Sequence, residues 1–483
     1  MGKARILVLG EPDTLRATVN YLRATGDFEV VGLLARAPLD DGDFCAPVLG
    51  SFDNLPEILA AHPIDYVVLS SRCDQATAQI LNDAAHYGIP VRILPAADDL
   101  LSDRLRVTRS LTQTEIDRAL DATGVEIDTS FHPALVETFR ERTVLITGAA
   151  GSIGSELSRQ AAQLPVSRLV LFDHDENTLV ELGDLLRGSG SPVEFVPVIG
   201  DIRDQDLVHH IFRTFLPQVV LHAAAYKHVP ALEENSCEAV LNNVSGTRIL
   251  AHAAIEADAE RFLLISTDKA VNPSSVMGAT KRAAELVVQQ QAGEAALLGR
   301  KTRLACVRFV NVLGSRGSVV PIFLRQIAEG GPVTITHEEM TRYFMTIPQA
   351  THLVLQASTL DSAGSIYMLE IGDPIRIVEC ARELIRMSGL EPERQIKFEL
   401  IGIRRGEKLH EQPAVRSDAL QKTIFSYIYQ VPTQPVPPGF AARLAAIESA
   451  ARARQSGHVV ELLSELPIDY QPAGAVSPNA ISS

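Results

Sequence analysis

The chain has 483 residues, of which 46% are hydrophobic and 21% charged, and its formal net charge is −15. The length exceeds one ordinary domain, and the composition is that of a globular protein with an ample core. An acidic chain without a run of Lys or Arg argues against nucleic acid and anionic membranes as partners.

The N-terminus lacks the apolar region of a signal peptide, and no segment reaches the roughly 18 apolar residues that a membrane helix needs. The five cysteines are scattered, which fits a reducing compartment, and none forms a CxxC pair. We therefore expect a soluble, cytoplasmic protein with no membrane span and no metal site.

The first part of the chain alternates short apolar runs with helically spaced segments, a pattern that builds a parallel sheet between helices. Residues 1–97 are expected to form a small Rossmann-like α/β domain, followed by a polar connector at 98–141. The first turn, Gly10-Glu11-Pro12-Asp13, puts an acid where a phosphate would lie, so we expect no cofactor there. The expected strands are Arg5–Leu9, Glu29–Leu34, Tyr66–Leu69 and Val91–Leu94, and the expected helices include Thr14–Ala24 and Ala76–Tyr87.

A second alternation begins at Thr143 and predicts an α/β fold, a doubly wound parallel sheet of the Rossmann type, over residues 142–435. After Asn311 the alternation of apolar runs and helical segments ends. The mixed pattern that follows is the one expected of a substrate-capping region. Prolines between 432 and 438 mark a linker to a helical segment at 436–472, and residues 473–483 are expected to be disordered. The expected strands are Thr143–Thr147, Leu169–Phe172, Val193–Val198, Val219–His222, Phe262–Ile265 and Leu304–Phe309, and the expected C-terminal helices are Phe440–Gln455 and Val459–Leu466.

A glycine-rich loop connects the first of these strands to a helix, Ser155–Gln163, in the sequence TVLITGAAGSIG. Gly148 allows a tight turn, Gly151 lets the backbone approach a pyrophosphate, and Gly154 permits close helix-to-strand packing. The loop therefore predicts a dinucleotide site that includes Thr147, Gly148, Gly151, Ser152, Ile153 and Gly154.

The residues after the next strand favour NAD over NADP. Asp173 ends that strand, where an acidic side chain bonds the adenosine ribose hydroxyls. Asp175 and Glu176 follow at once without a neighbouring Lys or Arg, so a 2′-phosphate would meet carboxylates alone. The adenine edge is expected at Asp201 and Ile202, and the predicted cofactor site also includes Ala223 and Ala224.

The catalytic stretch departs from the usual short-chain dehydrogenase pattern of Ser/Thr with YxxxK on a helix. Lys281 is in place, but the residue four before it is Met277, whose thioether cannot exchange protons. The chain is then either inactive or has its base elsewhere. Thr267, Asp268 and Lys269 leave the carboxyl end of a strand and supply an acid/base pair beside the cofactor.

Several motifs together resemble the UDP-N-acetylglucosamine 4,6-dehydratases of polysaccharide and glycan biosynthesis, which are extended short-chain dehydrogenases. More closely, the chain is similar to the long members that carry Met in place of the catalytic Tyr. The resemblance covers nearly the whole chain, although long members usually begin with membrane helices that this sequence lacks. The motifs are TGAAGSIGSEL, HAAAYKHVP, STDKAVNPSSVMGATKRAAE, VRFVNVLGSRGSVVPIF, MTRYFMTIPQA and GIRRGEKLHE.

The resemblance implies a closed redox cycle on the sugar. NAD removes hydride from C4, the ketone acidifies the C5 proton, water leaves across C5 and C6, and the hydride returns to C6. By resemblance, Asp268 protonates the departing C6 hydroxyl and Lys269 is the base at C5. Lys269 must then be neutral, and burial beside the cofactor's positive charge is expected to lower its pKa to roughly 7–8.

The resemblance also implies roles for the neighbouring residues. Thr267, or Ser266 in its place, would bond the C4 oxygen, and Lys281 would bond the nicotinamide ribose. The acceptor of the C4 hydroxyl proton stays open, and a water linked to Asp268 is our hypothesis. Asn243 is expected to order the backbone of the site. The expected contacts to the UDP-sugar substrate are Lys227, Arg308, Asn311, Ser318, Val319, Arg342 and Arg404.

Two other functions and one assembly state follow from the same residues. A UDP-sugar 4-epimerase would share the cofactor and the 4-keto intermediate but normally uses Tyr, and a non-catalytic NAD-binding scaffold would explain Met277. The helix Val276–Gln290 carries more apolar residues than its own sheet needs, and related enzymes pair through this helix. We therefore expect a homo-oligomer that is at least a dimer.

Overall fold

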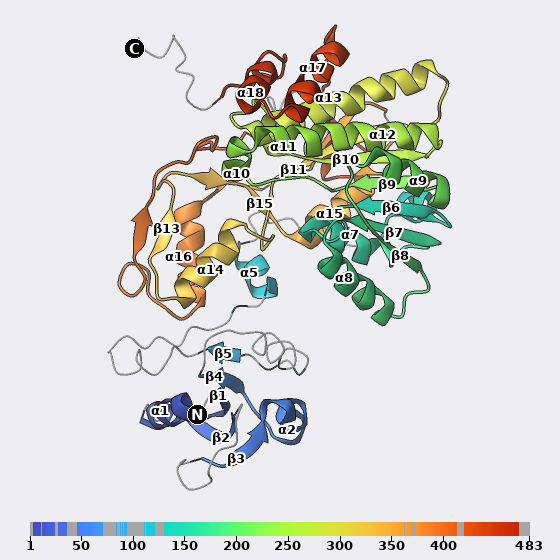
Figure 1. Cartoon of the computed structure of the whole chain (residues 1–483). Helices are drawn as coiled ribbons and strands as arrows, with labels where there is room; N and C mark the ends of the chain where they lie inside the picture. Colours follow the sequence, from blue (N-terminus) through green and yellow to red (C-terminus); the bar gives the residue numbers. More distant parts are fainter. Residues whose placement is uncertain are drawn as a thin grey trace, which may run out of the picture. The chain divides into compact units, whose positions relative to one another are not determined.

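Figure 1 shows a computed structural model of the chain, which describes residues 3–10, 12–24, 28–35, 46–70, 84, 87, 89, 91–93, 111, 113–120, 130–361, 363–369, 372–412 and 420–472. The chain divides into two compact units. One comprises Met1–Ala119, Ile322–Thr334 and Glu379–Glu399, and the other comprises Leu120–Pro321, Ile335–Val378 and Leu400–Ser483. Most of the expected helix Ala76–Tyr87, much of the expected connector and the whole expected tail 473–483 lie outside the described residues.

The N-terminal part of the first unit is a five-stranded parallel sheet in the order β3-β2-β1-β4-β5. Alternate residues of β1 face opposite sides, because side chains alternate along a strand. Ile6 and Val8 pack with residues of α1, whereas Leu7 and Leu9 pack with residues of α2. The elements are β1 (Ala4–Gly10), α1 (Pro12–Ala24), β2 (Phe28–Ala35), β3 (Val48–Ser51), the 3₁₀-helix η1 (Phe52–Asn54), α2 (Leu55–Ala61), β4 (Tyr66–Leu69), β5 (Val91–Ile93) and α5 (Gln113–Leu120).

The second unit is built on a nine-stranded sheet in the order β19-β20-β16-β11-β10-β9-β6-β7-β8. All six strands expected from the apolar runs are present, with ends within two residues of the expected ones, and the doubly wound fold is confirmed. Three further strands extend the sheet beyond β11: β16 is parallel to β11, β20 is antiparallel to β16, and β19 is antiparallel to β20. The strands are β6 (Thr143–Thr147), β7 (Arg168–Asp173), β8 (Glu194–Ile199), β9 (Val219–His222), β10 (Arg261–Thr267), β11 (Arg303–Phe309), β16 (Ile366–Leu369), β19 (Gln421–Lys422) and β20 (Ile428–Val431).

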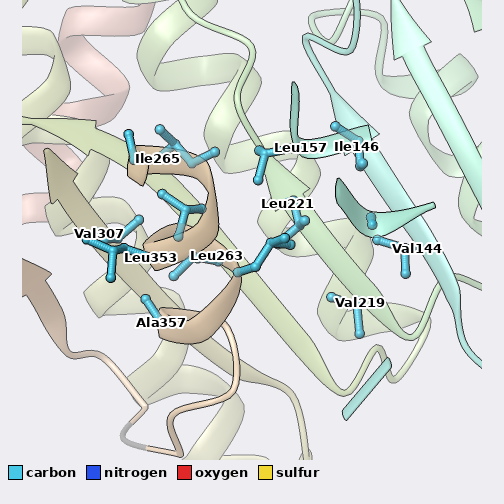
Figure 2. Close-up of a cluster of buried hydrophobic side chains, with 14 of the residues drawn as sticks. Val144, Ile146, Leu157, Val219, Leu221, Leu263, Ile265, Val307, Leu353 and Ala357 are labelled. Carbon is cyan, nitrogen blue, oxygen red and sulfur yellow. The ribbon is translucent and has the colours of Figure 1, made fainter. Parts of the chain in front are cut away.

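Apolar clusters cover both faces of this sheet. On one face, Val144, Ile146, Leu221 and Leu263 meet Leu157 of α7 and residues of α15 (Figure 2). The opposite residues of the same strands pack with α9, α12 and α13. The helices are α6 (Pro133–Phe139), α7 (Ser152–Ala161), α8 (Glu176–Gly188), α9 (Gln205–Phe215), α10 (Val229–Glu234), α11 (Ser236–Val240), the π-helix η2 (Leu241–Gly246), α12 (Thr247–Glu256), the 3₁₀-helix η3 (Asp268–Ala270), α13 (Val276–Leu297), α15 (Ile347–Ala357), α17 (Phe440–Arg452) and α18 (Ser456–Ser464).

Besides the strands β16, β19 and β20 of the main sheet, the mixed region after β11 forms three short two-stranded pairs. β12 (Asn311–Val312) pairs with β15 (Phe344–Met345), and β14 (Thr341–Arg342) pairs with β17 (Ile375–Arg376). β13 (Val333–Ile335) pairs with β18 (Phe398–Leu400). Two helices, α14 (Val319–Ala328) and α16 (Ile377–Met387), complete the region.

The order of the main sheet reverses at β6, which has β7 on one side and β9 on the other. In doubly wound sheets the crevice outside the carboxyl ends of the strands at such a reversal holds the ligand. The carboxyl ends of β6, β7 and β10 carry Thr147, Asp173 and Thr267. The topology therefore assembles at one edge of the sheet the residues that the sequence singled out.

The C-terminal helices cover the apolar surplus of α13. Leu286 and Val287 of α13 belong to one buried cluster with Leu444 and Ile447 of α17 and Val459 of α18. Figure 1 shows α17 and α18 lying over α11 and α13. An ion pair between Arg248 of α12 and the buried Glu448, with nitrogen–oxygen distances of 2.8 and 3.1 Å, joins α17 to the same layer.

This packing changes the basis of one expectation. The apolar excess on α13 led us to expect pairing between copies, but the chain's own helices α17 and α18 cover residues of that face. A sequence pattern shows that a helix has too much apolar surface for one neighbour, and it does not show which neighbour covers the rest. The homo-oligomer stays a prediction, and it no longer rests on this helix. No helix within the described ranges combines the length and the apolar character that a bilayer crossing requires.

Replacing Ile447 with Ala should lower the free energy of unfolding by about 2–5 kcal/mol, because the buried side chain leaves a cavity between α17 and α13. Ile447 is 1% exposed. Urea unfolding followed by circular dichroism measures the change. Leu297→Ala is the matched control, since Leu297 ends α13 and is 89% exposed. Equal stability of the two variants would show that the C-terminal helices do not pack on α13 in solution.

Candidate active site

The glycine-rich loop is closed by contacts between backbones. Gly148 has a φ of +67°, and a Cβ there would lie 2.6 Å from the backbone nitrogen of Ala224. A Cβ on Gly154 would collide with the carbonyl oxygen of Gly148. Only glycine fits these two positions, and Ser152 and Ile153 begin α7 directly after the turn. The N-terminal turn of α7 therefore faces the edge of the sheet with free backbone N–H groups, as a pyrophosphate requires.

Asp173 holds the loop from the end of β7. Its carboxylate accepts hydrogen bonds from the backbone nitrogens of Ala150 at 2.9 Å and Asp175 at 3.0 Å. The side chain is buried, and each oxygen keeps capacity for a further donor. Further along the edge, Asp201 accepts from Arg203 at 2.8 Å and Ile202 lies against Gly246 of the π-helix. The adenosine site at these positions stays a prediction.

The side chain of Asp175 has a cation nearby that comes from a distant part of the sequence. Arg316, from the loop after β12, donates its backbone N–H to Ser152 at 3.2 Å. Its guanidinium donates to Thr178 at 3.4 Å and lies 3.9 Å from Asp175. No Arg or Lys follows Asp173 closely in the sequence, but Arg316 lies close to Asp175 in the fold.

A buried hydrogen-bond chain joins β6 to the π-helix. Thr147 bonds Nδ1 of His222 at 2.7 Å, and Nε2 of His222 bonds Thr247 at 2.9 Å. Because Thr247 donates its own hydroxyl to the carbonyl of Asn243, it must accept from His222, which assigns the proton to Nε2. Burial lowers the pKa of His222 to about 3, so the ring is neutral. Asn243 exchanges two hydrogen bonds with the backbone of Tyr226, the ordering role expected for it.

The acid/base pair lies on η3, directly after β10. The Thr267 hydroxyl and the Lys269 amine both donate to Oδ1 of Asp268, at 2.8 and 3.1 Å. The same amine donates to Oδ1 of Asn311 at 3.0 Å and lies 3.7 Å from the carboxylate of Glu411. Four residues expected in the site, one from β10, two from η3 and one from β12, are therefore joined by hydrogen bonds.

The expected depression of the Lys269 pKa is wrong for the protein by itself. Burial lowers the pKa of Lys269, but the negative charges of Asp268 and Glu411 outweigh it and raise the pKa above its ordinary value. The sequence argument counted burial and the cofactor's charge, and it omitted a second carboxylate from a distant segment. Lys269 is therefore an ammonium held between two carboxylates.

Lys281 and Met277 lie on the same helix but in different surroundings. The amine of Lys281 donates to the carbonyl of Ile265 at 2.7 Å, and burial lowers its pKa to about 8. Met277 is buried in the apolar cluster that includes α17. The side chain at the usual Tyr position is thus packed as a hydrophobic residue.

Arg308 and Ser266 are engaged away from the crevice. Arg308 makes two hydrogen bonds to Glu285 of α13, at 2.7 and 2.6 Å, and the Ser266 hydroxyl donates to the same carboxylate at 2.7 Å. All three residues are buried. Burial raises the pKa of Glu285, but Arg308 outweighs burial and lowers it to about 2. A buried ion pair thus occupies the Arg308 guanidinium, and its expected contact with the substrate stays a prediction, as does the choice between Thr267 and Ser266 for the C4 oxygen.

The remaining expected substrate residues divide into two groups. Lys227 donates to Ser315 at 3.3 Å in the loop that ends with Ser318 and Val319, where α14 begins. Arg342 donates to the carbonyl oxygens of Thr341, Lys408 and Leu409, and its Nε lies 3.8 Å from Glu411. Arg404 instead is half exposed and pairs with Glu407 at 3.2 Å. Lys227, Asn311 and Arg342 thus belong with the catalytic cluster or the loop, and Arg404 lies on the surface.

Sequence reasoning missed Glu411, Lys408, Glu285, His222 and Arg316. Glu411 and Lys408 stand in the motif GIRRGEKLHE, which was noticed as a motif, but only its first Arg was considered for the site. The charged residues of this motif could have been taken as candidates for the site from the sequence. Their distance to Lys269 could not be predicted, because it depends on the path of the segment after β18.

Several known proteins are similar to this chain in sequence. CapD of Staphylococcus aureus, a capsular polysaccharide biosynthesis protein, is 41% identical over 386 residues, which are 79% of this chain and 63% of CapD. The chain thus spans less than two thirds of that relative. An inverting UDP-N-acetylglucosamine 4,6-dehydratase of Campylobacter jejuni is 31% identical over 278 residues, 56% of this chain and 77% of that protein.

A UDP-glucose 4-epimerase of Rickettsia canadensis is also 31% identical, over 298 residues, 61% of this chain and 84% of that protein. The solved structure of Pen from Bacillus thuringiensis matches with a TM-score of 0.56 and 30% identity, and covers 62% of this chain and 91% of that chain. The model of a family described as "Polysaccharide biosynthesis protein" matches residues 144–433, which is more than half of the chain. With the doubly wound sheet and the glycine-rich loop, this match shows that the chain belongs to the polysaccharide biosynthesis protein family of the extended short-chain dehydrogenases.

Proposed function

We propose that the protein is a nucleotide-sugar 4,6-dehydratase that holds NAD and acts on UDP-N-acetylglucosamine. The observation that carries the proposal is the buried contact of 3.1 Å between Asp268 and Lys269 at the carboxyl end of β10, combined with an apolar Met277 at the usual Tyr position. A dehydratase needs an acid and a base close together, because it must remove a proton at C5 and protonate a leaving hydroxyl at C6. The similarity to the C. jejuni dehydratase supports this reading.

The fit of the dinucleotide rests on the loop. Gly148, Gly151 and Gly154 would let the backbone approach the pyrophosphate, Asp173 would accept from the adenosine ribose, and Lys281 would donate to the nicotinamide ribose. When bound, NAD would take hydride from C4 of the sugar and return it to C6. Ala223 and Ala224 offer no side chain that would block the approach, and Asp201 and Ile202 would border the adenine.

One proton transfer would prepare the pair for the chemistry. The pair can exist in two forms that differ only in the place of one proton. In one form Lys269 is an ammonium and Asp268 a carboxylate, and in the other Lys269 is a neutral amine and Asp268 a carboxylic acid. Transfer across their contact would make the base for C5 and the acid for the C6 hydroxyl in one step. No proton has to leave the pair, but the raised pKa of Lys269 opposes this transfer, and the positive charge of the bound nicotinamide would lower that pKa. The C5 proton goes to Lys269, and the C6 hydroxyl leaves as water with the proton of Asp268.

The neighbouring groups would orient the sugar and its diphosphate. Thr267 lies at the end of β10 and could donate to the C4 oxygen in place of its bond to Asp268. Lys227 and Arg342 could bind the phosphates, for which Arg is well suited. A water linked to Asp268 stays our hypothesis for the acceptor of the C4 hydroxyl proton, because Met277 cannot serve.

A UDP-sugar 4-epimerase is the second candidate, since an epimerase relative is equally similar. Mass spectrometry of the product from purified protein and UDP-N-acetylglucosamine separates the two functions. We expect the loss of one water. A product of unchanged mass with inverted C4 would establish the epimerase, and the absence of any conversion would favour the scaffold.

Gly154→Ala should abolish retention of the dinucleotide, because the added Cβ collides with the carbonyl of Gly148 and opens the loop. The wild-type protein should keep NAD through gel filtration, since the hydride returns within each turnover. The dinucleotide released by denaturation is measured per chain. Gly293→Ala is the control, because a Cβ on Gly293 of α13 meets nothing within 4 Å. A Gly154→Ala protein with full dinucleotide content would contradict the assignment of the loop.

Lys269→Ala should reduce dehydration on the order of 10²–10⁴-fold, the usual contribution of one general base. The variant should also fail to introduce solvent deuterium at C5, as read by NMR of the sugar. Met277→Ala should alter packing yet leave measurable turnover, since its thioether takes no part in proton transfer. Normal deuterium incorporation by Lys269→Ala would show that the C5 base is another group.

A further inference from the structure

The carboxylate of Glu411 is a buried charge that the proposed mechanism does not use. Its side chain is 3% exposed and comes from the last described residues before the gap at 413–419. Its Oε1 lies 3.7 Å from the Lys269 amine and 3.8 Å from Nε of Arg342, and its Oε2 lies 4.0 Å from the Lys408 amine. A carboxylate buried among three cations offsets part of their positive charge and also holds them in position.

Among the described residues, four charged groups and one amide surround the Lys269 amine. Asp268 faces it from η3, Arg342 from β14, and Lys408 and Glu411 from the segment after β18, with the neutral Asn311 on β12. Asp268 and Glu411 are negative, and Arg342 and Lys408 are positive beside Lys269. Burial lowers the pKa of Lys408 as well, so this cluster is a low-dielectric environment in which charges act strongly.

Two carboxylate oxygens in this cluster have no hydrogen-bond donor among the described residues. Within the described residues, Oδ2 of Asp268 and Oε2 of Glu411 are buried without a hydrogen bond. Unsatisfied buried carboxylate oxygens are costly, and they persist where a function or a ligand requires them. They lie on the two carboxylates that flank the Lys269 amine, one supplied by β10 and η3 and the other by the C-terminal segment.

We propose that Glu411 is a positioning residue that holds the Lys269 amine between two carboxylates and sets the pH range in which the Asp268–Lys269 pair carries its one proton. The inference rests on the proposed dehydratase function. Glu411 does not exchange a proton with the sugar. Its charge favours the protonated forms of the pair, and its contact, together with Asn311, limits where the amine can move.

The sign of the effect follows from electrostatics. The active pair holds one proton, so activity falls at low pH when a second proton enters and at high pH when the last one leaves. An adjacent anion raises both apparent pKa values of the pair. Removing the charge of Glu411 therefore shifts the whole bell-shaped profile to lower pH.

The test compares Glu411→Gln and Glu411→Asp with the wild type in pH profiles of kcat/KM for water loss from UDP-N-acetylglucosamine. Glu411→Gln should move the profile to lower pH by about one unit, a tenfold change in proton affinity. Glu411→Asp keeps the charge, so its profile should stay in place while kcat falls about tenfold because the shorter side chain withdraws. Glu461→Gln, on the exposed end of α18, is the charge-matched control and should match the wild type.

The outcomes separate the two proposals. A wild-type protein that releases no water from the sugar defeats the dehydratase function itself. An active wild type with an unshifted Glu411→Gln profile overturns the role of Glu411, whatever the loss in rate, because a purely structural defect lowers activity without moving the pH limits. Dinucleotide content and thermal unfolding of each variant show whether the fold is intact. If Glu411→Gln does not fold, Glu411→Ala also removes the charge and should give the same shift to lower pH, and an unshifted profile overturns the role.

Discussion

The parallel pairing of β10 between β9 and β11 is the constraint on which the site depends. Its register places Thr267 opposite Phe309 and Leu264 opposite His222, so the carboxyl ends of these strands meet at one edge. Side chains that leave this edge must share a small space, and backbone N–H groups of α7 face the same space from β6. Without this register, Lys269 and Asn311 would not contact each other.

Two clusters of buried charge in this unit are compensated in different ways. Beneath the site, Glu285 and Arg308 form a closed pair whose hydrogen bonds are made, which stabilises a fixed structure. At the carboxyl end of β10, the Lys269 amine lies between two carboxylates, and each of these has one oxygen without a hydrogen bond among the described residues. The first arrangement holds both charges in hydrogen bonds, whereas the second brings the acid and the base of the proposed proton transfer into contact.

Neutral polar groups complete the scaffold. His222 cannot take a charge at physiological pH, because it is buried with its two ring nitrogens already bonded to Thr147 and Thr247. This chain ties the strand before the glycine-rich loop to the π-helix that carries Asn243, and Asn243 in turn holds the backbone at Tyr226. π-Helical turns inside helices often occur at functional sites, and here the turn lies against Ile202 at the expected adenine edge.

The sequence by itself determined the two α/β sheets, the loop around Gly148 and the pair Asp268–Lys269, because apolar periodicity, glycine spacing and adjacency along the chain are local properties. It could not determine that Arg308 pairs with Glu285, that α17 covers α13, or that Glu411 reaches Lys269. Each of these is a contact between segments far apart in the chain, and a charged or apolar residue has the same pattern whichever partner it meets. The Lys269 pKa illustrates the difference, since its direction depends on the number of carboxylates around the amine, and only the tertiary structure supplies the second one.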